Sequence, residues 1–411
     1  MNRSDSVPRP EPRLGLLANR SQFLLLVAVT AFVGALVGLE RSVVPLLASE
    51  TFGIVSAAAV GSFLVAFAPA KAVANLVAGR LSERAGRRRV LIAGWLIGAP
   101  VPFIVILAPA WEWIVAANLL LGVNQGLTWS MTVNMKIDLV GPRNRGFALG
   151  LNESAGYIAV GASAFAAGLI AAQAGLRPEP FYLGIAAVAA GTALSVLFVR
   201  DTGEHVAAEG AGGGPVTAPS LRSALIDGSF RRPDLQAIHQ AGLVNNANDA
   251  LVWALLPLVL LARGLDVAAV GLVAAAYPLT WGLLNVPAGW LSDRLGRAPL
   301  IVAGMLLQAL AVAALAPDLG LTGALLAAVV LGVGTALVYP TLIAAVSDRV
   351  APAGRATHIG VYRFWRDLGT LAGALGAGIA TDLFGPVPAI LGVALVTAAS
   401  GIVVAVRLPR G

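Results

Sequence analysis

The chain contains no cysteine among its 411 residues. It can therefore form neither a disulfide nor a thiolate metal site. Its three histidines, His205, His239 and His358, fall in a polar linker or near the starts of apolar segments, and we expect no metal centre. No Walker loop precedes an apolar segment, which argues against ATP as the energy source. No nucleophile is recognisably paired with a base, so we expect neither an enzyme nor a bound cofactor.

Charge is scarce as well. Only 12% of the residues are charged and 58% are hydrophobic, with a mean hydropathy of +0.83, whereas soluble domains carry roughly 25% charged residues. This composition excludes a soluble globular protein. In a membrane every backbone polar group must be satisfied internally, so only helices or a closed barrel can cross it. The apolar runs are about 20 residues long, the length of a membrane helix rather than of a barrel strand.

The apolar runs predict an all-α membrane protein with twelve transmembrane helices. The expected spans are residues 22–47, 55–79, 90–109, 113–137, 147–171, 181–199, 237–261, 268–291, 299–317, 322–346, 357–380 and 387–407. A glycine-rich polar stretch separates the sixth span from the seventh and is typical of a flexible linker. We therefore expect an N-terminal six-helix bundle over residues 1–200, a linker over 201–236 and a C-terminal six-helix bundle over 237–411.

The arginines predict the orientation. They gather in the N-terminal segment and in every second loop, whereas the alternate loops contain only Arg177 and Arg263. Because loops rich in Lys and Arg stay on the cytoplasmic side, we expect both termini and the linker to be cytoplasmic, in a plasma or bacterial inner membrane. The net charge of +7 therefore reflects topology, and the arginines form no continuous basic face for nucleic acid.

A charged turn occurs twice. Gly79 to Arg89 reads GRLSERAGRRR and Gly289 to Arg297 reads GWLSDRLGR, each between two apolar segments. The same offset of 210 residues carries Asp138, Pro142 and Arg145 onto Asp348, Pro352 and Arg355. The glycines allow a positive φ at a tight turn. A chance cluster of arginines does not explain two copies at equal depth, so the chain is predicted to be a tandem duplication.

This repeated turn resembles motif A of the major facilitator superfamily, and the twelve spans with a central linker fit that family over the whole chain. The resemblance implies two six-helix bundles around a central cavity, alternating access by rocking of the bundles, and a cytoplasmic gate that closes in the outward-facing state. Glu83 stands where the family usually has Asp. The gate residues implied are Gly79, Glu83, Arg84, Gly86, Arg87, Asp138, Arg145, Gly289, Asp293, Arg294, Gly296, Arg297, Asp348 and Arg355.

Charged side chains inside the spans require an explanation, since each costs on the order of 2.5–3.5 kcal/mol at the bilayer centre. Some are expected to be structural ion pairs, above all Arg363 with Asp367, four residues apart on one helix. Comparison of the halves helps to sort them: Glu40 corresponds to Ala250, Lys71 to Trp281 and Glu153 to Arg363. The candidates for substrate or proton binding are Glu40, Arg41, Lys71, Asn118, Gln125, Trp129, Lys136, Asn152, Glu153, Asn248, Asp249 and Arg363.

The fourth span is the most polar. Asn118, Gln125, Trp129, Thr132 and Lys136 fall on one face of a helix with 100° per residue. Such a stripe must face protein or water. A hydrogen-bonded seam between helices is one interpretation. A face lining the cavity is slightly favoured, because Trp129 offers a solute an amphipathic surface.

Burial and nearby charge govern how readily a carboxylate takes up a proton, so a proton and a solute can compete at Glu40, Glu153 or Asp249. Drug–proton antiporters of the family often carry an acidic residue in the first helix, which Glu40 resembles. Asn118, however, replaces the arginine that antiporters often have before Gly122. We expect a monomeric secondary active transporter that moves a small organic solute, coupled to protons and favouring efflux. The alternatives are an importer of an organic anion, favoured if Arg41, Lys71 and Lys136 line the cavity unpaired, and a non-transporting membrane receptor.

Overall fold

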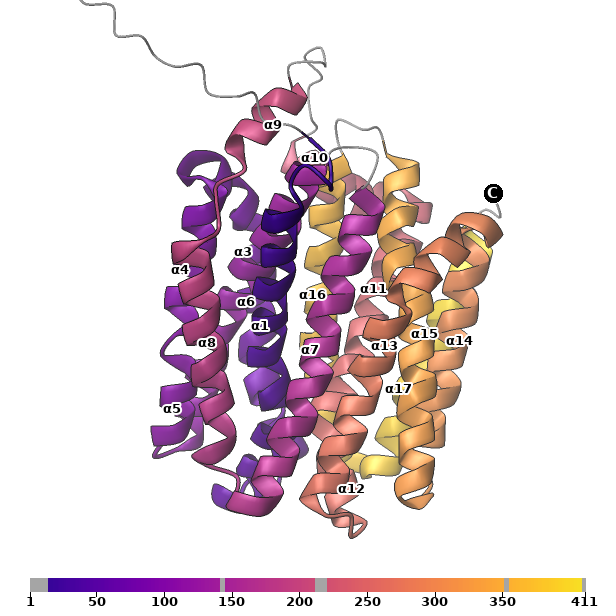
Figure 1. Ribbon diagram of the computed structural model, residues 1–411. Coiled ribbons are helices and arrows are strands. Elements are labelled where there is room, and N and C mark those ends of the chain that lie inside the picture. Colours follow the sequence, from indigo (N-terminus) through magenta and orange to yellow (C-terminus); the bar gives the residue numbers. More distant parts are fainter. Residues whose placement is uncertain (1–13, 141–144, 211–219, 351–354, 409–411) are drawn as a thin grey trace, which may run out of the picture.

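The computed structural model describes residues 14–140, 145–210, 220–350 and 355–408. Within its helices it describes no side chain at positions 79, 80, 83, 145–149, 207, 209, 210 and 355–357. The described residues are almost entirely helical and include no β-strand. The fold is the predicted all-α membrane architecture of two similar bundles, which lie side by side in Figure 1.

Both halves repeat the same order of helices. The first half consists of α1 (Arg20–Leu46), η1 (Leu47–Thr51), α2 (Ala57–Val60), α3 (Ser62–Ala85), α4 (Arg87–Gly98), α5 (Val101–Leu107), α6 (Trp111–Val140), α7 (Arg145–Ala174) and α8 (Glu179–Leu197). The connection contains α9 (Gly203–Gly210), α10 (Leu221–Ile226) and η3 (Asp227–Arg231). The second half consists of α11 (Pro233–Ala250), η4 (Leu251–Leu255), α12 (Leu256–Ala262), α13 (Val267–Leu295), α14 (Arg297–Ala314), α15 (Gly320–Arg349), α16 (Arg355–Phe384) and α17 (Pro386–Arg407).

The expected spans are found as helices whose ends differ by a few residues. Three of them are interrupted: the second at Gly61 between α2 and α3, the third at Pro100 between α4 and α5, and the seventh by the π-helical turn η4. Ten helices of the described chain are long and apolar enough to cross a membrane. Two 30-residue helices, α6 and α16, are outside that set; α6 buries Lys136 and Asp138, and α16 contains Arg366 and Asp367.

The structure shows the duplication in its backbone. Helix α7 and helix α16 begin and end at positions 210 residues apart, and α4 and α14 begin with the same offset. Gly86 has φ 86° and ψ 150°, and Gly296 has φ 87° and ψ 161°. These are conformations that a residue with a Cβ rarely adopts. The expectation that glycines with positive φ make both charged turns is therefore confirmed.

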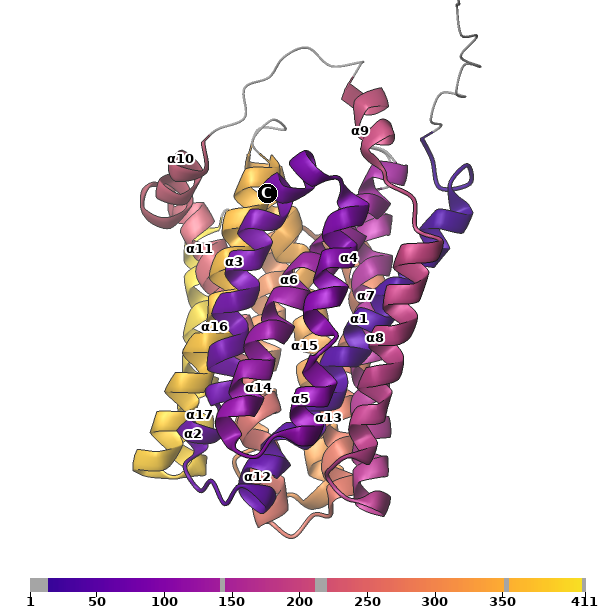
Figure 2. The same cartoon turned by 90° about the vertical axis from the view of Figure 1, so that its left-hand side faces the viewer.

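The bundles meet along two helix pairs, α7 with α13 and α3 with α16 (Figures 1 and 2). Small residues allow the close contacts, as is usual between membrane helices. A Cβ built on Gly168 of α7 would lie 2.8 Å from the Cα of Gly271 of α13. Within the first bundle, a Cβ on Gly34 of α1 would lie 2.2 Å from the carbonyl oxygen of Gly156 of α7.

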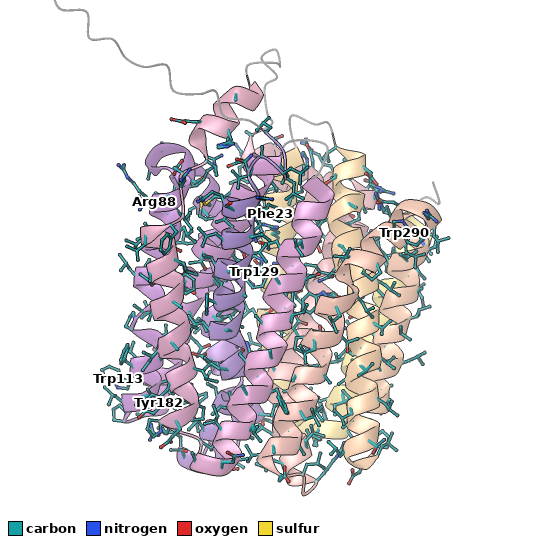
Figure 3. The ribbon with its side chains drawn as sticks, in the orientation of Figure 1. Phe23, Arg88, Trp113, Trp129, Tyr182 and Trp290 are labelled. Carbon is teal, nitrogen blue, oxygen red and sulfur yellow. The ribbon has the colours of Figure 1, made fainter. Side chains whose placement is uncertain are left out.

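The outer surface has the features of a membrane protein. Large apolar side chains such as Leu395 and Val406 are more than two-thirds exposed on it, where lipid would cover them. Exposed aromatic residues lie at both ends, Trp113 and Tyr182 at one and Trp290 at the other (Figure 3). Trp and Tyr at these two levels are typical of the two membrane interfaces. We call the end that carries Trp290, α9 and α10 the arginine-rich end, and the other the opposite end.

Candidate functional site: a cavity between the two bundles

A small central cavity lies between the bundles and is built from both of them. Its lining residues are Phe67, Ala68 and Lys71 of α3, Tyr157 of α7, Asn246 and Asp249 of α11, Trp253 of η4, and Asp367 and Thr370 of α16. The cavity volume of about 20 Å³ leaves room for about one water molecule. The bundles must therefore separate before an organic solute can fit.

Lys71 is a cation that faces this cavity from the first bundle. Its Nζ makes no hydrogen bond or ion pair with any described residue. It lies 5.6 Å from the ring centre of Phe67 and 5.9 Å from that of Trp129. Figure 3 shows Trp129 near mid-height of the molecule, and Lys71, whose Nζ lies 5.9 Å from the Trp129 ring centre, is therefore far from both ends. Aromatic faces stabilise such a cation but leave its three N–H donors free.

Arg41 lies directly behind the cavity wall. It is 1% exposed, and none of its three guanidinium nitrogens has a hydrogen-bond partner among the described residues. The guanidinium is surrounded by three rings, with centres at 4.7 Å for Phe67, 5.0 Å for Trp253 and 5.6 Å for Phe63. We call these four residues the Arg41 cage. Its Phe67 and Trp253 also line the cavity, and Trp253 belongs to the other bundle.

Asp249 is the carboxylate that the second bundle contributes from α11. It is 1% exposed and accepts a hydrogen bond from the hydroxyl of Tyr277. The Tyr277 hydroxyl also lies 3.2 Å from Oγ1 of Thr335, so its orientation is held from two sides. Lys71 and Asp249 thus place opposite charges on opposite walls of the same cavity.

Asp367, the second carboxylate of the cavity, is fully paired. Arg366 donates to it at 2.5 Å, and Nδ2 of Asn75 donates to it at 2.7 Å from the other bundle. Arg366 also donates to the hydroxyl of Tyr339. The expected pair of Arg363 with Asp367 is therefore wrong: no ion pair of Arg363 occurs in the described part of the chain. The adjacent Arg366 satisfies Asp367 instead.

Aromatic rings close the space beside the cavity and join the bundles. Tyr157 of α7 stacks on Trp281 of α13, with ring centres 3.5 Å apart. Trp129 lies 5.3 Å from Tyr157, and Tyr339 lies 4.8 Å from Trp281. Trp281 and Tyr339 were not predicted as site residues. They occupy the positions that the 210-residue offset assigns to Lys71 and Trp129, so the duplication was the signal that could have found them.

The polar stripe of the fourth span forms a seam between helices, and the slightly favoured expectation that it lines the cavity is not met. Gln125 donates to the carbonyl of Val33 at 2.9 Å, which joins α6 to α1. Trp129 donates to Glu153 at 3.1 Å, which joins α6 to α7. Neither Gln125 nor Trp129 is among the residues that line the cavity.

Three of the other candidates, Lys136, Asn152 and Glu153, belong to the same seam. Lys136 donates to Asn152 at 2.6 Å and to Thr30 at 2.8 Å, and Asn152 donates to Glu153 at 3.1 Å. Asn118 donates to the carbonyl of Ile114 on its own helix at 3.1 Å. A wide polar stripe is compatible with either environment, and the sequence does not say which helix covers it.

Two further predicted site residues, Asn248 and Glu40, also lie outside the cavity. Asn248 donates to Oε1 of Gln308 at 2.8 Å and accepts from the hydroxyl of Thr397 at 2.9 Å, so it belongs to a hydrogen-bonded seam in the second bundle. Glu40 is buried beside Arg41, and its Oε2 has no partner among the described residues. Of the twelve predicted residues, only Lys71 and Asp249 line the cavity, and Arg41 lies behind its wall.

The gate residues form matching ion pairs at the arginine-rich end. Nε of Arg87 lies 2.6 Å from Asp138, and Nε of Arg297 lies 2.9 Å from Asp348, the equivalent pair of the second bundle. Arg297 also pairs with Asp293 at 2.6 Å. Each pair lies within one bundle. The side chains of Glu83, Arg145 and Arg355 and the surroundings of Gly79 lie outside the described residues, and the gating role of the set remains a prediction.

The remaining gate residues are at the surface of this end. Arg294 stacks over the ring of Trp290 at 3.9 Å, and the Arg84 side chain is exposed. A Cβ on Gly289 would meet nothing within 4 Å. Close backbone approach therefore does not explain the first glycine of the second copy.

A contact at the opposite end joins the bundles directly. The carboxylate of Asp382 on α16 accepts hydrogen bonds from the hydroxyl of Ser56 at 2.6 Å, from the N–H of Ala57 at 2.7 Å and from the N–H of Ala58 at 3.2 Å. The N–H groups that begin a helix lack partners within it and attract a negative charge. This contact was not predicted, because nothing in the sequence places α16 beside α2 (Figure 2).

Comparison with known proteins identifies a family whose model matches the chain, and solved structures with a similar fold. The family model described as "Major Facilitator Superfamily" matches residues 21–237 and again 240–411. Among solved structures, the nucleoside transporter NupG aligns with a TM-score of 0.72 at 14% identity, over 95% of this chain and 100% of its own. A POT family transporter in complex with 5-aminolevulinic acid aligns with a TM-score of 0.75 at 14% identity, over 94% and 96%. A bacterial homolog of the human lysosomal transporter Spinster, in an inward-facing and unoccupied conformation, aligns with a TM-score of 0.69 at 17% identity, over 95% of each chain.

Proposed function

The chain belongs to the Major Facilitator Superfamily, and on that premise we propose that it moves a small organic solute across a cytoplasmic membrane by alternating access, as a proton-coupled secondary transporter. The observation that carries this proposal is the central cavity, whose walls come from both bundles and whose volume is about 20 Å³. A site shared by two bundles opens to one side or the other as they rock against each other. We include in the proposal cytoplasmic termini, a monomeric carrier, and a non-enzymatic role.

Asp249 is our candidate for the proton-binding group. It lines the cavity and is buried, and one of its oxygens is occupied by Tyr277. Its neighbour in the cavity, Asp367, is already paired with Arg366 and Asn75. A carboxylate without a cation in direct contact is the group whose charge changes most readily with its surroundings. The proton is therefore assigned to Asp249 rather than to Asp367.

The direction of coupling follows from the charge of the solute. Efflux by exchange with protons requires a solute that competes for a carboxylate, and the sequence pointed to Glu40 for this role. Glu40 does not line the cavity, whereas Lys71 does so without a hydrogen bond or ion pair to any described residue. This observation favours the second candidate function, transport of an organic anion together with a proton. Lys136, the third cation named for that alternative, is held by Thr30 and Asn152 and gives it no support.

The test uses proteoliposomes with an imposed pH gradient of either sign. Under the proposal, Asp249→Asn abolishes uptake driven by the gradient but keeps exchange of labelled for unlabelled solute at equal pH. Asn248→Asp is not a suitable control, because it breaks a seam. Ser42→Ala is suitable, since the Ser42 hydroxyl donates to backbone carbonyls, that of Ala164 at 2.9 Å and that of Leu39 at 3.5 Å. If gradient-driven uptake survives in Asp249→Asn, the proton is carried elsewhere. The direction of solute movement separates the two functions: exchange moves the solute opposite to the proton flow, and cotransport moves it in the same direction as the protons.

A further inference from the structure

We propose that the Arg41 cage is a covered binding site for the carboxylate of a small organic anion, and that Trp253 acts as its movable cover. This inference rests on the proposed transport function and names the class of solute. In the structure, where the bundles are in contact, the ring of Trp253 lies over the Arg41 guanidinium, in the position that the carboxylate would occupy. When the bundles separate, the ring leaves with the second bundle and the anion binds Arg41 together with Lys71.

The first reason is the state of the Arg41 guanidinium. It is 1% exposed, and Nε, Nη1 and Nη2 all lack hydrogen-bond partners among the described residues. A guanidinium presents five donors in a planar fork that fits a carboxylate with two parallel hydrogen bonds. Buried arginines in structural roles usually use those donors. An arginine that uses none of them is suited to a partner that comes and goes.

The second reason is where the three rings come from. Phe63 and Phe67 are on α3, in the same bundle as Arg41, and they remain beside it when the bundles move. Trp253 is on η4 of the other bundle, and its ring centre lies 5.0 Å from the guanidinium carbon. Its indole nitrogen has no hydrogen-bond partner among the described residues, so ring packing and the cation hold it there. A π-helical turn such as η4 is frequently found at functional sites in helices.

The third reason is that the cage opens toward the cavity. Phe67 and Trp253 are both cavity-lining residues, and Lys71 lies one helical turn from Phe67 on the same face of α3. Removal of the Trp253 ring would therefore join the Arg41 guanidinium to the space into which Lys71 already projects. Two cations without hydrogen-bond partners then face one space.

The remaining charges define how much negative charge the solute carries. Glu40 adjoins Arg41 and is buried with it, Asp249 faces the cavity, and Asp367 is paired with Arg366. Arg41 and Lys71 are therefore matched in number by Glu40 and Asp249, neither of which forms an ion pair with a described residue. Glu153 forms none either, but it lies in the seam with Lys136, which adds one charge of each sign. A bound monoanion adds one negative charge, which a proton on Asp249 balances. The aromatic residues Phe67, Tyr157 and Trp253 suit a flat apolar body, so the class is an aromatic or similarly flat monocarboxylate.

The second half of the chain shows which side chain can replace Arg41 in this fold. The position of Arg41 corresponds to Leu251 in the second half, so Arg41→Leu copies a side chain already present at that depth. Ser42→Ala on the same helix is the matched control. Trp253→Leu removes the cover without touching either cation. The two test variants are expected to change binding in opposite directions, which a general loss of stability does not produce.

The experiment measures equilibrium binding of radiolabelled benzoate to the full-length protein in detergent, with unlabelled benzamide as the neutral competitor of the same shape. We expect saturable benzoate binding that benzamide does not displace. The Kd is expected to rise at least tenfold in Arg41→Leu and to fall about threefold or more in Trp253→Leu, with no change in Ser42→Ala. The proposal is overturned if wild type shows no saturable benzoate binding, if benzamide competes equally, or if Arg41→Leu binds as wild type does.

Should Arg41→Leu fail to fold, Trp253→Leu decides: a Kd equal to or higher than that of wild type overturns the role of Trp253 as a cover. Failure of the transport function is distinguished by the cysteine-labelling measurement described below. A protein whose cavity thiol is labelled as expected in that measurement, but which binds no benzoate, remains a transporter of another class of solute.

Discussion

Substitution of Gly168 by alanine is expected to open the cavity toward the opposite end. Gly168 of α7 and Gly271 of α13 meet where the bundles touch near that end, and a new Cβ on Gly168 would lie 2.8 Å from the Cα of Gly271. Carbon atoms prefer a separation of about 3.5–4.0 Å. The two helices must therefore move apart by about 0.7–1.2 Å there. Because the neighbour is backbone, no side-chain rotation can relieve the contact.

The energetic effect follows from overpacking. An added methyl in a well-packed contact costs about 1–3 kcal/mol, and this cost falls only on the state in which α7 and α13 touch. The ratio of open to closed molecules is then expected to rise by a factor of roughly 5 to 150. Helix propensity does not distinguish the states, since α7 is helical in both. Gly376→Ala is the matched control, because a Cβ on Gly376, also in a helix, meets nothing within 4 Å.

The assay uses the absence of cysteine in the natural chain. Thr370→Cys places a single thiol on the cavity wall at a position that is 4% exposed. A membrane-impermeant maleimide is added to the side that the opposite end faces, and the labelling rate is measured in sealed vesicles. Gly168→Ala is expected to raise this rate severalfold over the parent, and Gly376→Ala to leave it unchanged. Equal rates in all three proteins would refute the assignment of Gly168 and Gly271 to the closure of this end.

Three further results are expected. Asp382→Asn keeps the shape of the side chain but removes the charge that holds Ser56 and the N–H groups of α2. Labelling of the same cavity thiol should rise about two- to tenfold, because a hydrogen bond contributes about 0.5–1.5 kcal/mol net. Arg87→Gln should lower the unfolding temperature more than Arg297→Gln, since the Asp138 side chain is 12% exposed and that of Asp348 is 50% exposed, and exposed pairs contribute about 0–1 kcal/mol. Lys136→Met should destabilise the protein in a thermal unfolding assay without changing benzoate affinity, because Lys136 belongs to the seam; a change in affinity at unchanged stability would contradict that placement.

The sequence was sufficient for the architecture because the decisive signals were local. Apolar runs of membrane-spanning length, a central polar linker and two copies of one charged turn each depend on residues close together in the chain. The structure places helices at all the expected spans and gives Gly86 and Gly296 the same positive φ. Breaks at Pro100 and η4 were not predicted, since membrane helices tolerate proline and continue through it in many cases.

The site was less predictable because its contacts are between distant segments. Helical periodicity placed Gln125 and Trp129 on one face correctly, but whether that face meets a neighbouring helix or a cavity depends on α1 and α7. Sequence spacing favoured Arg363 as the partner of Asp367. In the structure the Asp367 carboxylate instead accepts hydrogen bonds from Asn75 of the other bundle and from the adjacent Arg366. Both errors arise from judging a buried polar residue by its own helix alone.

Comparison of the two halves with each other explains why the cavity can be selective although the fold is duplicated. At the arginine-rich end the halves agree, with the same ion pair in each, which is expected if both bundles take part in the proposed rocking motion. At the centre they differ: Lys71 corresponds to Trp281, and Arg41 corresponds to Leu251. The first bundle therefore contributes cations where the second contributes apolar and aromatic side chains, and the carboxylate Asp249 comes from the second bundle. A solute that carries one negative charge and binds between them touches both bundles at once, so its binding and their movement are linked.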